Sequence, residues 1–480
     1  MSAWRGPAWP AWVAASVFFV ATVFVLGGRL LPVCALDHNV GVYVTLAELA
    51  RQGVVYPHEQ STDLVYCTFY QPLAFLPYSI LPGSGLTLVP SIRALVRVEV
   101  LACLAGVVVL LRRLRLRWDA ALIGAAVAAC ATPVTAAMMK CIDDPRGAAL
   151  ALAAAAVFAM GGRLRPAAAA PVFVLAFLTK LTAPCAAGVA ALAVALRRRQ
   201  IGSALALLGL CAGGSVLVYA VAHGLLGWDL AGNGLRYALF DARPGRSLGQ
   251  QVAHFGRDLA CDSLSALLLV GGGLLALGRA VRWRADPVDV WLLAALARAF
   301  VEYGSHGTEL NHLFEACLAA AVVVARAAAP CLAGWWGVVV LAFAALLGRP
   351  ALRVPCGDET PLPRSQLAVA AQVLRAQPPA PTLCEDPLLA WTAGQRPLVT
   401  DPFLAGKVLD RCPQIRAAWF GEAGDPRALR RLVLLANPDE PGRADAWYTN
   451  LQFDARFLAD VRRLFVVVAA SDFGTVLKRR

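Results

Sequence analysis

The sequence predicts a mainly α-helical protein, namely a polytopic membrane helix bundle of about 10–12 spans with a small C-terminal extracytoplasmic α/β domain. Of the 480 residues, 59% are hydrophobic and only 16% are charged, and the mean hydropathy is +0.62. An ordinary soluble domain has about 25% charged residues. The formal net charge of +13 comes largely from arginines in short loops between apolar runs, where they orient helices. No nucleic-acid-binding motif is visible, so we expect no nucleic-acid partner.

Apolar segments define the expected spans. Several are shorter than the roughly 20 residues that a perpendicular helix needs. Pro184 separates two short segments that we expect to form broken helices. Pro72, Pro77 and Pro82 punctuate a further apolar run, which favours a re-entrant or surface helix over residues 72–81. The expected spans are 12–31, 92–111, 119–138, 145–160, 167–183, 185–196, 201–222, 263–277, 288–301, 310–324 and 331–347.

Arginines in alternate loops predict the orientation, because short basic loops stay in the cytoplasm. With a cytoplasmic N-terminus, all of these loops fall on the cytoplasmic side of the cytoplasmic (inner) membrane. A long first loop at residues 32–91 and the other intervening loops then lie outside, and the six histidines fall in them or at their edges. We therefore expect the polar chemistry at the extracytoplasmic face. The loop arginines are Arg112, Arg113, Arg115, Arg117, Arg163, Arg165, Arg197, Arg198, Arg199, Arg279, Arg282, Arg284 and Arg326.

Residues 350–480 form a second expected domain after the bundle of residues 1–349. This tail is rich in proline at its start. Apolar runs such as PLVTD and LFVVVAAS alternate with the helical pattern SQLAVAAQVLRAQ, which is typical of a small α/β domain. Cysteines in the tail and the outer loops could form one or two disulfides in an oxidising compartment. Small apolar cysteines that pack in the protein are the other interpretation.

Ionisable and polar residues gather in the expected outer loops. An ionisable residue costs about 2.5–3.5 kcal/mol at the centre of a membrane helix, so such residues usually face a cavity and mark function. A carboxylate can take a proton from a hydroxyl group, and a cation can neutralise a phosphate leaving group. The outer positions are Asp37 and His38 in PVCALDHNVGVY, Tyr70 in YCTFYQPL, Asp143, Asp144 and Arg146 in MKCIDDPRG, Lys180 in FLTKLTAPC, and His306, Glu309 and His312 in EYGSHGTELNHLFE.

Each of these residues also has a purely structural interpretation. Asp37 is a suitable cap for the helix that follows it. Asp143 and Asp144 precede a proline, the residue favoured in a first helical turn, so they too could cap a helix. Lys180 could extend to the membrane interface, and the two histidines of the last outer loop lack the spacing of a helical zinc pair. The argument for function rests on the gathering of all these residues at one face.

Short motifs resemble those of the GT-C glycosyltransferases. An acidic residue follows the first helix, LAFLTK is similar to a threonine-lysine step of that superfamily, and NHLFE looks like its late Asn-Tyr/His-Leu-x-Glu segment. The tail segment LCEDPLLAWTAGQRPLVTDPF resembles the outer domain of bacterial members. The first loop carries a G-x-x-Y-P-like step (Gly53, Tyr56, Pro57) and a Y-x-P-L step (Tyr70, Pro72, Leu73). The chain thus resembles protein O-mannosyltransferases, the aminoarabinose transferase of lipid A and RgtA/B/C/D-like membrane transferases.

The resemblance implies transfer of a sugar from a polyprenyl-phosphate-linked donor to an acceptor hydroxyl on a glycan, lipid or protein at the outer face. Asp37 matches the acidic residue that serves as the base, and either aspartate of the second outer loop matches a second acidic position. Relatives often have an acidic pair where this chain has Asp-His, so the base and a divalent metal stay open, and the sequence requires no cofactor. The expected roles are catalysis for Asp37, Asp143 and Asp144, donor-phosphate binding for Lys180, Arg146 and His312, and acceptor or sugar contacts for His38, Tyr70, His306 and Glu309.

A multi-pass transporter or carrier-lipid flippase is the alternative, because it too needs charged residues in a membrane cavity. We detect no inverted or parallel repeat, which counts against a transporter. A non-catalytic scaffold is a third interpretation.

Overall fold

A computed structural model describes most of the chain. Asp37, His306 and Glu309 lie outside the described residues, as does nearly all of the first expected span, so the predictions for them stay open. The described residues are 9, 13, 38–68, 70–159, 164–236, 246–260, 263–305, 310–332, 334–347, 364–375, 380–422, 424–435, 437–440, 442, 444, 448, 453, 455–471 and 474–480.

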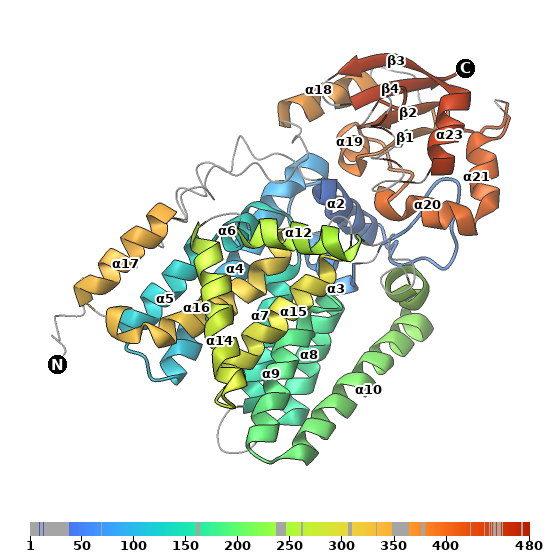
Figure 1. The fold of residues 1–480 in the computed structure, drawn as a ribbon. Coiled ribbons are helices and arrows are strands. Elements are labelled where there is room, and N and C mark those ends of the chain that lie inside the picture. Colours follow the sequence, from blue (N-terminus) through green and yellow to red (C-terminus); the bar gives the residue numbers. More distant parts are fainter. Residues whose placement is uncertain are drawn as a thin grey trace.

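Apolar helices form a bundle between residues 88 and 347 (Figure 1). Alanine and leucine, which are strong helix formers, dominate them. Prolines stand in the first turns of α7, α8, α9 and α15, where a missing N–H has no helical partner to lose. The helices are α4 (Leu88–Arg113), α5 (Trp118–Cys130), α6 (Thr132–Met139), α7 (Asp144–Ala159), α8 (Pro166–Thr179), α9 (Ala183–Arg197), α10 (Ile201–Leu226), α12 (Leu248–Leu259), α13 (Ser263–Ala266), α14 (Gly272–Val281), α15 (Pro287–Glu302), α16 (Phe314–Ala327) and α17 (Gly334–Leu347).

In the described part of the chain, 4 helical stretches are long and apolar enough to cross a membrane, or 5 if the bent pair α5–α6 counts as one span. Shorter apolar helices accompany them. The membrane helix bundle is therefore confirmed as a fold class. The stretches are Gly85–Arg113, Ile201–Leu226, Ser263–Val281 and Leu310–Ala327.

Residues 119–138, predicted as one span, form two helices instead. α5 and α6 meet at an angle of 68°. Between them Ala131 is extended, with ψ of 137°, and Pro133 stands in the first turn of α6. A proline lacks the donor that would continue a helix, and it restricts the residue before it. The chain therefore restarts in a new direction at Thr132.

Two helices of the first loop cover one end of the bundle. α2 (His38–Arg51) begins the described part of the loop, and α3 (Pro72–Ser79) occupies the place of the predicted re-entrant or surface helix. The guanidinium group of Arg51 donates to the carbonyl oxygens of Ser79 and Leu81. Since the last carbonyls of a helix lack helical partners, this arginine completes α3 and fixes it to α2.

The turns with arginines lie at the opposite end of the bundle from the turns with the predicted site residues. α7 starts at the site and ends before one basic turn, α8 returns to the site, and α9 leads to the next basic turn. Residues in these turns and in the adjoining helix ends form ion pairs. Arg326 pairs with Asp286, and Arg279 lies 2.8 Å from Asp289.

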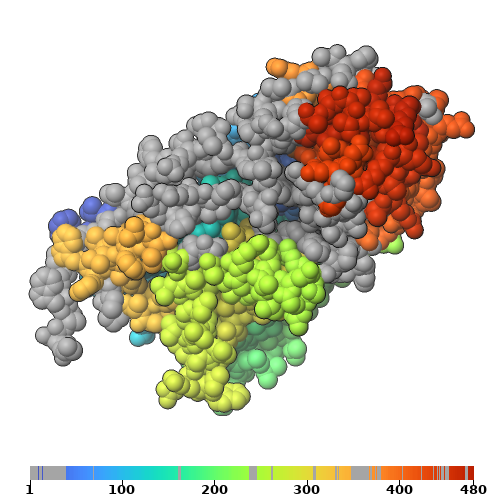
Figure 2. All heavy atoms as spheres, turned by 45° about the horizontal axis from the view of Figure 1, so that its top comes forward, coloured from blue at the N-terminus to red at the C-terminus, as the bar shows by residue number. Residues whose placement is uncertain are grey.

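A four-stranded sheet follows the bundle, which confirms the predicted sheet region near the C-terminus. β1 and β2 are parallel, whereas β4 is antiparallel to both β2 and β3, in the order β1-β2-β4-β3. Residues 364–480, here called the C-terminal lobe, project from one end of the helices (Figure 2). Its elements are α18 (Arg364–Arg375), β1 (Thr382–Cys384), α19 (Pro387–Thr392), α20 (Pro402–Arg411), α21 (Pro413–Phe420), β2 (Arg431–Leu434), α23 (Ala455–Leu464), β3 (Phe465–Ser471) and β4 (Gly474–Arg479).

Candidate active site

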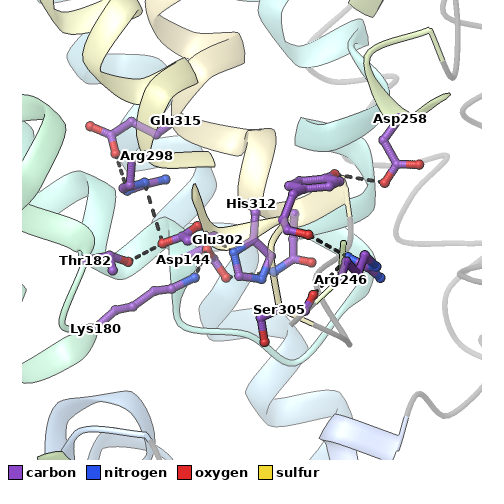
Figure 3. A network of polar contacts seen from close by, with 12 residues as sticks. Asp144, Lys180, Thr182, Arg246, Asp258, Arg298, Glu302, Ser305, His312 and Glu315 are labelled. Carbon is purple, nitrogen blue, oxygen red and sulfur yellow. Dashed lines mark hydrogen bonds and ion pairs between the residues drawn. The ribbon is translucent and has the colours of Figure 1, made fainter. Parts of the chain in front are cut away.

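Three turns at one end of the bundle bring polar side chains together (Figure 3). Asp143 and Asp144 lie where the chain enters α7, and Lys180 follows the last residue of α8. His312 lies in the short 3-10 turn Leu310–Leu313 before α16. Because the helices alternate in direction, turns far apart in the sequence meet at the same end of the bundle.

Asp144 is bound by two side chains. Lys180 Nζ lies 2.6 Å from its Oδ1 atom, and Asn311 Nδ2 donates to its Oδ2 atom at 2.9 Å. Burial opposes the charge of Lys180, but the carboxylates of Asp144 and Glu302 outweigh it and raise the pKa of Lys180. The ammonium group therefore stays charged. It has three protons to donate, and the bond to Asp144 uses one of them.

A second carboxylate, at the end of α15, orients the histidine. Glu302 Oε2 lies 2.6 Å from Nδ1 of His312. Thr182 donates to the other Glu302 oxygen, and Arg298 lies 3.8 Å from that oxygen. Arg298 also pairs with Glu315 at 2.6 Å. The two nitrogens of an imidazole ring bind separately, and the contact with Glu302 uses Nδ1.

Sequence reasoning assigned no role to Asn311, Thr182, Arg298 or Glu302. For Arg298 a signal exists, because an arginine within an apolar segment usually marks a functional site. Asn311 lies in the NHLFE motif, next to the histidine that was assigned a role. Thr182 carries no signal of its own, since its contact with Glu302 spans 120 residues of sequence.

Asp143 faces α2 rather than Lys180. The hydroxyl group of Tyr43 donates to its Oδ1 atom at 2.9 Å. Asp143 is only 3% exposed. Burial, followed by the neighbouring Asp144 carboxylate, raises the pKa of Asp143 to about 6. A carboxyl group whose pKa lies close to the working pH is suited to accept a proton during a reaction.

Tyr70 extends this side of the site. Its ring lies 4.5 Å from the ring of Tyr43 between centroids, and its hydroxyl group donates to Asn39 Oδ1 at 3.2 Å. Asn39 and Tyr43 both belong to α2, which begins at His38. Tyr70 is thus linked to Asp143 through Tyr43, and the sugar or acceptor contacts of Tyr70 and His38 stay predictions.

Arg146 makes contacts that hold neighbouring helices together. Its Nε atom donates to Glu99 of α4 at 2.6 Å. The guanidinium group also donates to the carbonyl oxygens of Leu73 and Ala74 in α3. Arg146 therefore joins α7 to α3 and α4. Its predicted contact with the donor phosphate stays a prediction, and these bonds give Arg146 a structural role as well.

Among the described residues, no group of three or more histidine, cysteine, aspartate or glutamate side chains is placed to hold a metal ion. Asp37, His306 and Glu309 are not part of that set. The divalent metal therefore stays open.

The fold is similar to that of a solved structure. The crystal structure of ArnT from Cupriavidus metallidurans bound to undecaprenyl phosphate has a TM-score of 0.61 with this chain, over 98% of each chain, at 13% sequence identity. The chain therefore shares the fold of that structure. At this identity the likeness shows the fold alone. No protein-family model matches the chain, and no curated protein does.

Proposed function

We propose that the protein transfers a sugar from a polyprenyl-phosphate donor to an acceptor hydroxyl at the extracytoplasmic face of the cytoplasmic membrane. The observation that carries this proposal is the Lys180–Asp144 pair with Asp143 beside it. A charged lysine and two carboxylates meet there at the end of an apolar bundle. The GT-C fold supports the proposal, since the ArnT structure with the same fold contains undecaprenyl phosphate.

In this reaction the acceptor oxygen forms a bond to the anomeric carbon of the sugar, and the bond from that carbon to the phosphate oxygen breaks. The acceptor proton passes to a carboxylate, and the polyprenyl phosphate leaves with one more negative charge. Lys180 neutralises that charge through the protons that Asp144 does not bind, and His312 contributes Nε2. Removal of one such preorganised donor typically slows a reaction about 10²–10³-fold.

Asp143 is the described carboxylate best suited to accept the proton, because Tyr43 orients it and its pKa is raised to about 6. Asp144 stays ionised against Lys180 and acts by holding the lysine in place. Asp37, which the family resemblance assigns as the base, is the other candidate.

The orientation follows from the arginine turns. Short basic loops stay in the cytoplasm, and these turns lie at the far end of the bundle from Asp144 and Lys180. The site then faces the extracytoplasmic side, and the C-terminal lobe lies on that same side.

Two measurements on purified full-length protein in lipid nanodiscs test the proposal: transfer of labelled sugar from undecaprenyl-phosphate sugars, and affinity for undecaprenyl phosphate. Lys180→Ala should weaken binding of the carrier about 10–10²-fold, as expected for a lost hydrogen bond to a charged group. Lys407→Ala, which changes an exposed lysine of α20, should bind as the wild type does. Equal affinity of all three proteins would remove Lys180 from the site. Carrier movement across vesicles without sugar transfer would favour the flippase alternative.

A further inference from the structure

α2 lies between the candidate site and the C-terminal lobe. Residues 40–49 of this helix are all buried. Successive residues of an α-helix turn by about 100° around its axis, so residues two apart point in nearly opposite directions. Asn39 and Tyr43 therefore share one face, which contacts Tyr70 and Asp143. Gly41 and Thr45 share the opposite face.

The Gly41 face meets the first turn of α19. A Cβ atom on Gly41 would lie 2.4 Å from Oδ1 of Asp386 and 3.1 Å from the backbone nitrogen of Leu388. Asp386 is buried and caps α19, because its Oδ1 atom accepts from the Leu388 N–H at 2.8 Å. The oxygen is thus held in place, and only glycine allows this approach.

A second contact lies one turn further along both helices. The indole Nε1 atom of Trp391 donates to Oγ1 of Thr45 at 2.9 Å. Leu388 and Leu389 of α19 belong to the same apolar core as Val42 and Leu46 of α2. The two helices are therefore in register at two points, with apolar packing between them.

The lobe is also bound to the first loop away from α2. Val65 forms a parallel bridge with Val399, the Cys67 N–H donates to Thr400 Oγ1 at 2.8 Å, and Trp419 Nε1 donates to the carbonyl oxygen of Thr62 at 2.8 Å. These contacts fix the lobe independently, so that α19 presents a fixed surface to α2.

We propose that α19 of the C-terminal lobe positions α2 for catalysis, with Gly41, Asp386 and Trp391 as positioning residues that hold the Tyr43 hydroxyl group on Asp143. The inference rests on the proposed function for its catalytic consequence. A hydrogen bond of 2.9 Å weakens steeply when its atoms separate. A displacement of about 1 Å far from the chemistry can lower a rate about 10²-fold.

The experiment uses full-length protein with 3-fluorotyrosine at position 43. Its ¹⁹F resonance should move as Asp143 titrates, and Asp143→Asn should abolish that movement. Gly41→Ala should strongly reduce the movement, because the methyl group displaces α2 from α19. Asp386→Ser should restore it in the Gly41→Ala background, since serine caps helices about as well as aspartate and is one atom shorter. Gly106→Ala, in a helix with nothing within 4 Å of the new methyl group, is the matched control.

Sugar transfer is the second measurement. Gly41→Ala should lower turnover about 10–10²-fold and shift the acidic limb of its pH profile to higher pH. Tyr43→Phe should cause the same shift, and the Gly41→Ala/Tyr43→Phe variant should shift the limb no further. If Gly41→Ala does not fold, Trp391→Phe, which removes the indole N–H donor and keeps an aromatic ring, should move both readouts in the same direction. A wild-type ¹⁹F titration and pH profile in Gly41→Ala, or in Trp391→Phe where it is the variant used, would overturn the positioning role. A wild-type protein that shows the ¹⁹F behaviour but transfers no sugar would refute the proposed function and leave the α19–α2 coupling standing.

Discussion

The Lys180 ammonium group lies 2.6 Å from Oδ1 of Asp144, and the two residues come from different helices of the bundle. Their side chains are 19% and 7% exposed. A pair with so little solvent access gains little net stability, because desolvation of both charges offsets their attraction. Its position among other polar side chains at the bundle end is therefore better explained by function than by stability.

Substitution of each candidate base by asparagine distinguishes Asp143 from Asp37. Asp143→Asn should lower sugar transfer about 10²–10⁴-fold if Asp143 accepts the proton, and Asp37→Asn should do so if Asp37 does. Asparagine caps a helix about as well as aspartate, so a pure capping role predicts little change. Turnover of labelled donor by each purified variant is the measurement, with its melting temperature as the control for folding. Normal turnover in both variants would place the base elsewhere.

The pH dependence should follow Asp143. Its pKa of about 6 means that the carboxyl group is protonated at lower pH and cannot accept a proton, so transfer should fall as the pH drops through about 6. The Tyr43 bond favours the charged form, as does Lys180, whereas Asp144 opposes it. Tyr43→Phe should therefore move the acidic limb to higher pH. An unchanged limb would exclude Asp143 as the titrating group.

Arg146 should affect folding more than donor binding. Arg146→Ala leaves Glu99 largely buried without its partner and should lower the free energy of unfolding by about 3–5 kcal/mol. The Arg146→Ala/Glu99→Ala pair should lose less. Thermal unfolding and undecaprenyl phosphate affinity of the same samples are to be compared. A weakened affinity at an unchanged melting temperature would instead make Arg146 a phosphate ligand, as the sequence predicted.

The membrane orientation can be tested with fusions. Alkaline phosphatase fused after Arg480 should be active, because it would lie outside the cytoplasm with the C-terminal lobe. A truncated chain that ends at Arg199, in a basic turn, should hold the same enzyme inactive. The reverse pattern would place the candidate site in the cytoplasm and contradict the polyprenyl-phosphate proposal.

Much of the architecture could be predicted because composition dominates it. Apolar segments and arginine turns define the helices and their order, and the run LFVVVAAS indeed forms β3. The sequence did not predict the break between α5 and α6 at Thr132, because a single proline within an apolar run does not determine whether the helix bends there. PLVTD was read as a possible sheet element, but Val399 instead pairs with Val65 of the first loop.

The candidate site was predictable only in part. Asp144, Lys180 and His312 stand out as ionisable residues at helix ends, and the structure brings them together. Tyr43 does not stand out, because a tyrosine in an amphipathic helix is usually a packing residue. Its bond to Asp143 joins residues 100 positions apart, and such a contact depends on how α2 packs rather than on any local pattern.

α10 packs against the rest of the protein over only a small part of its surface. Only 11% of its most apolar window is buried inside the protein, compared with 72% for Leu310–Ala327. Lipid chains adapt their shape to whatever side chain they meet, so leucine, valine, isoleucine and alanine are nearly interchangeable on such a surface. Substitutions can accumulate there without moving the backbone. Two chains can therefore diverge to 13% identity and still superimpose over 98% of their length.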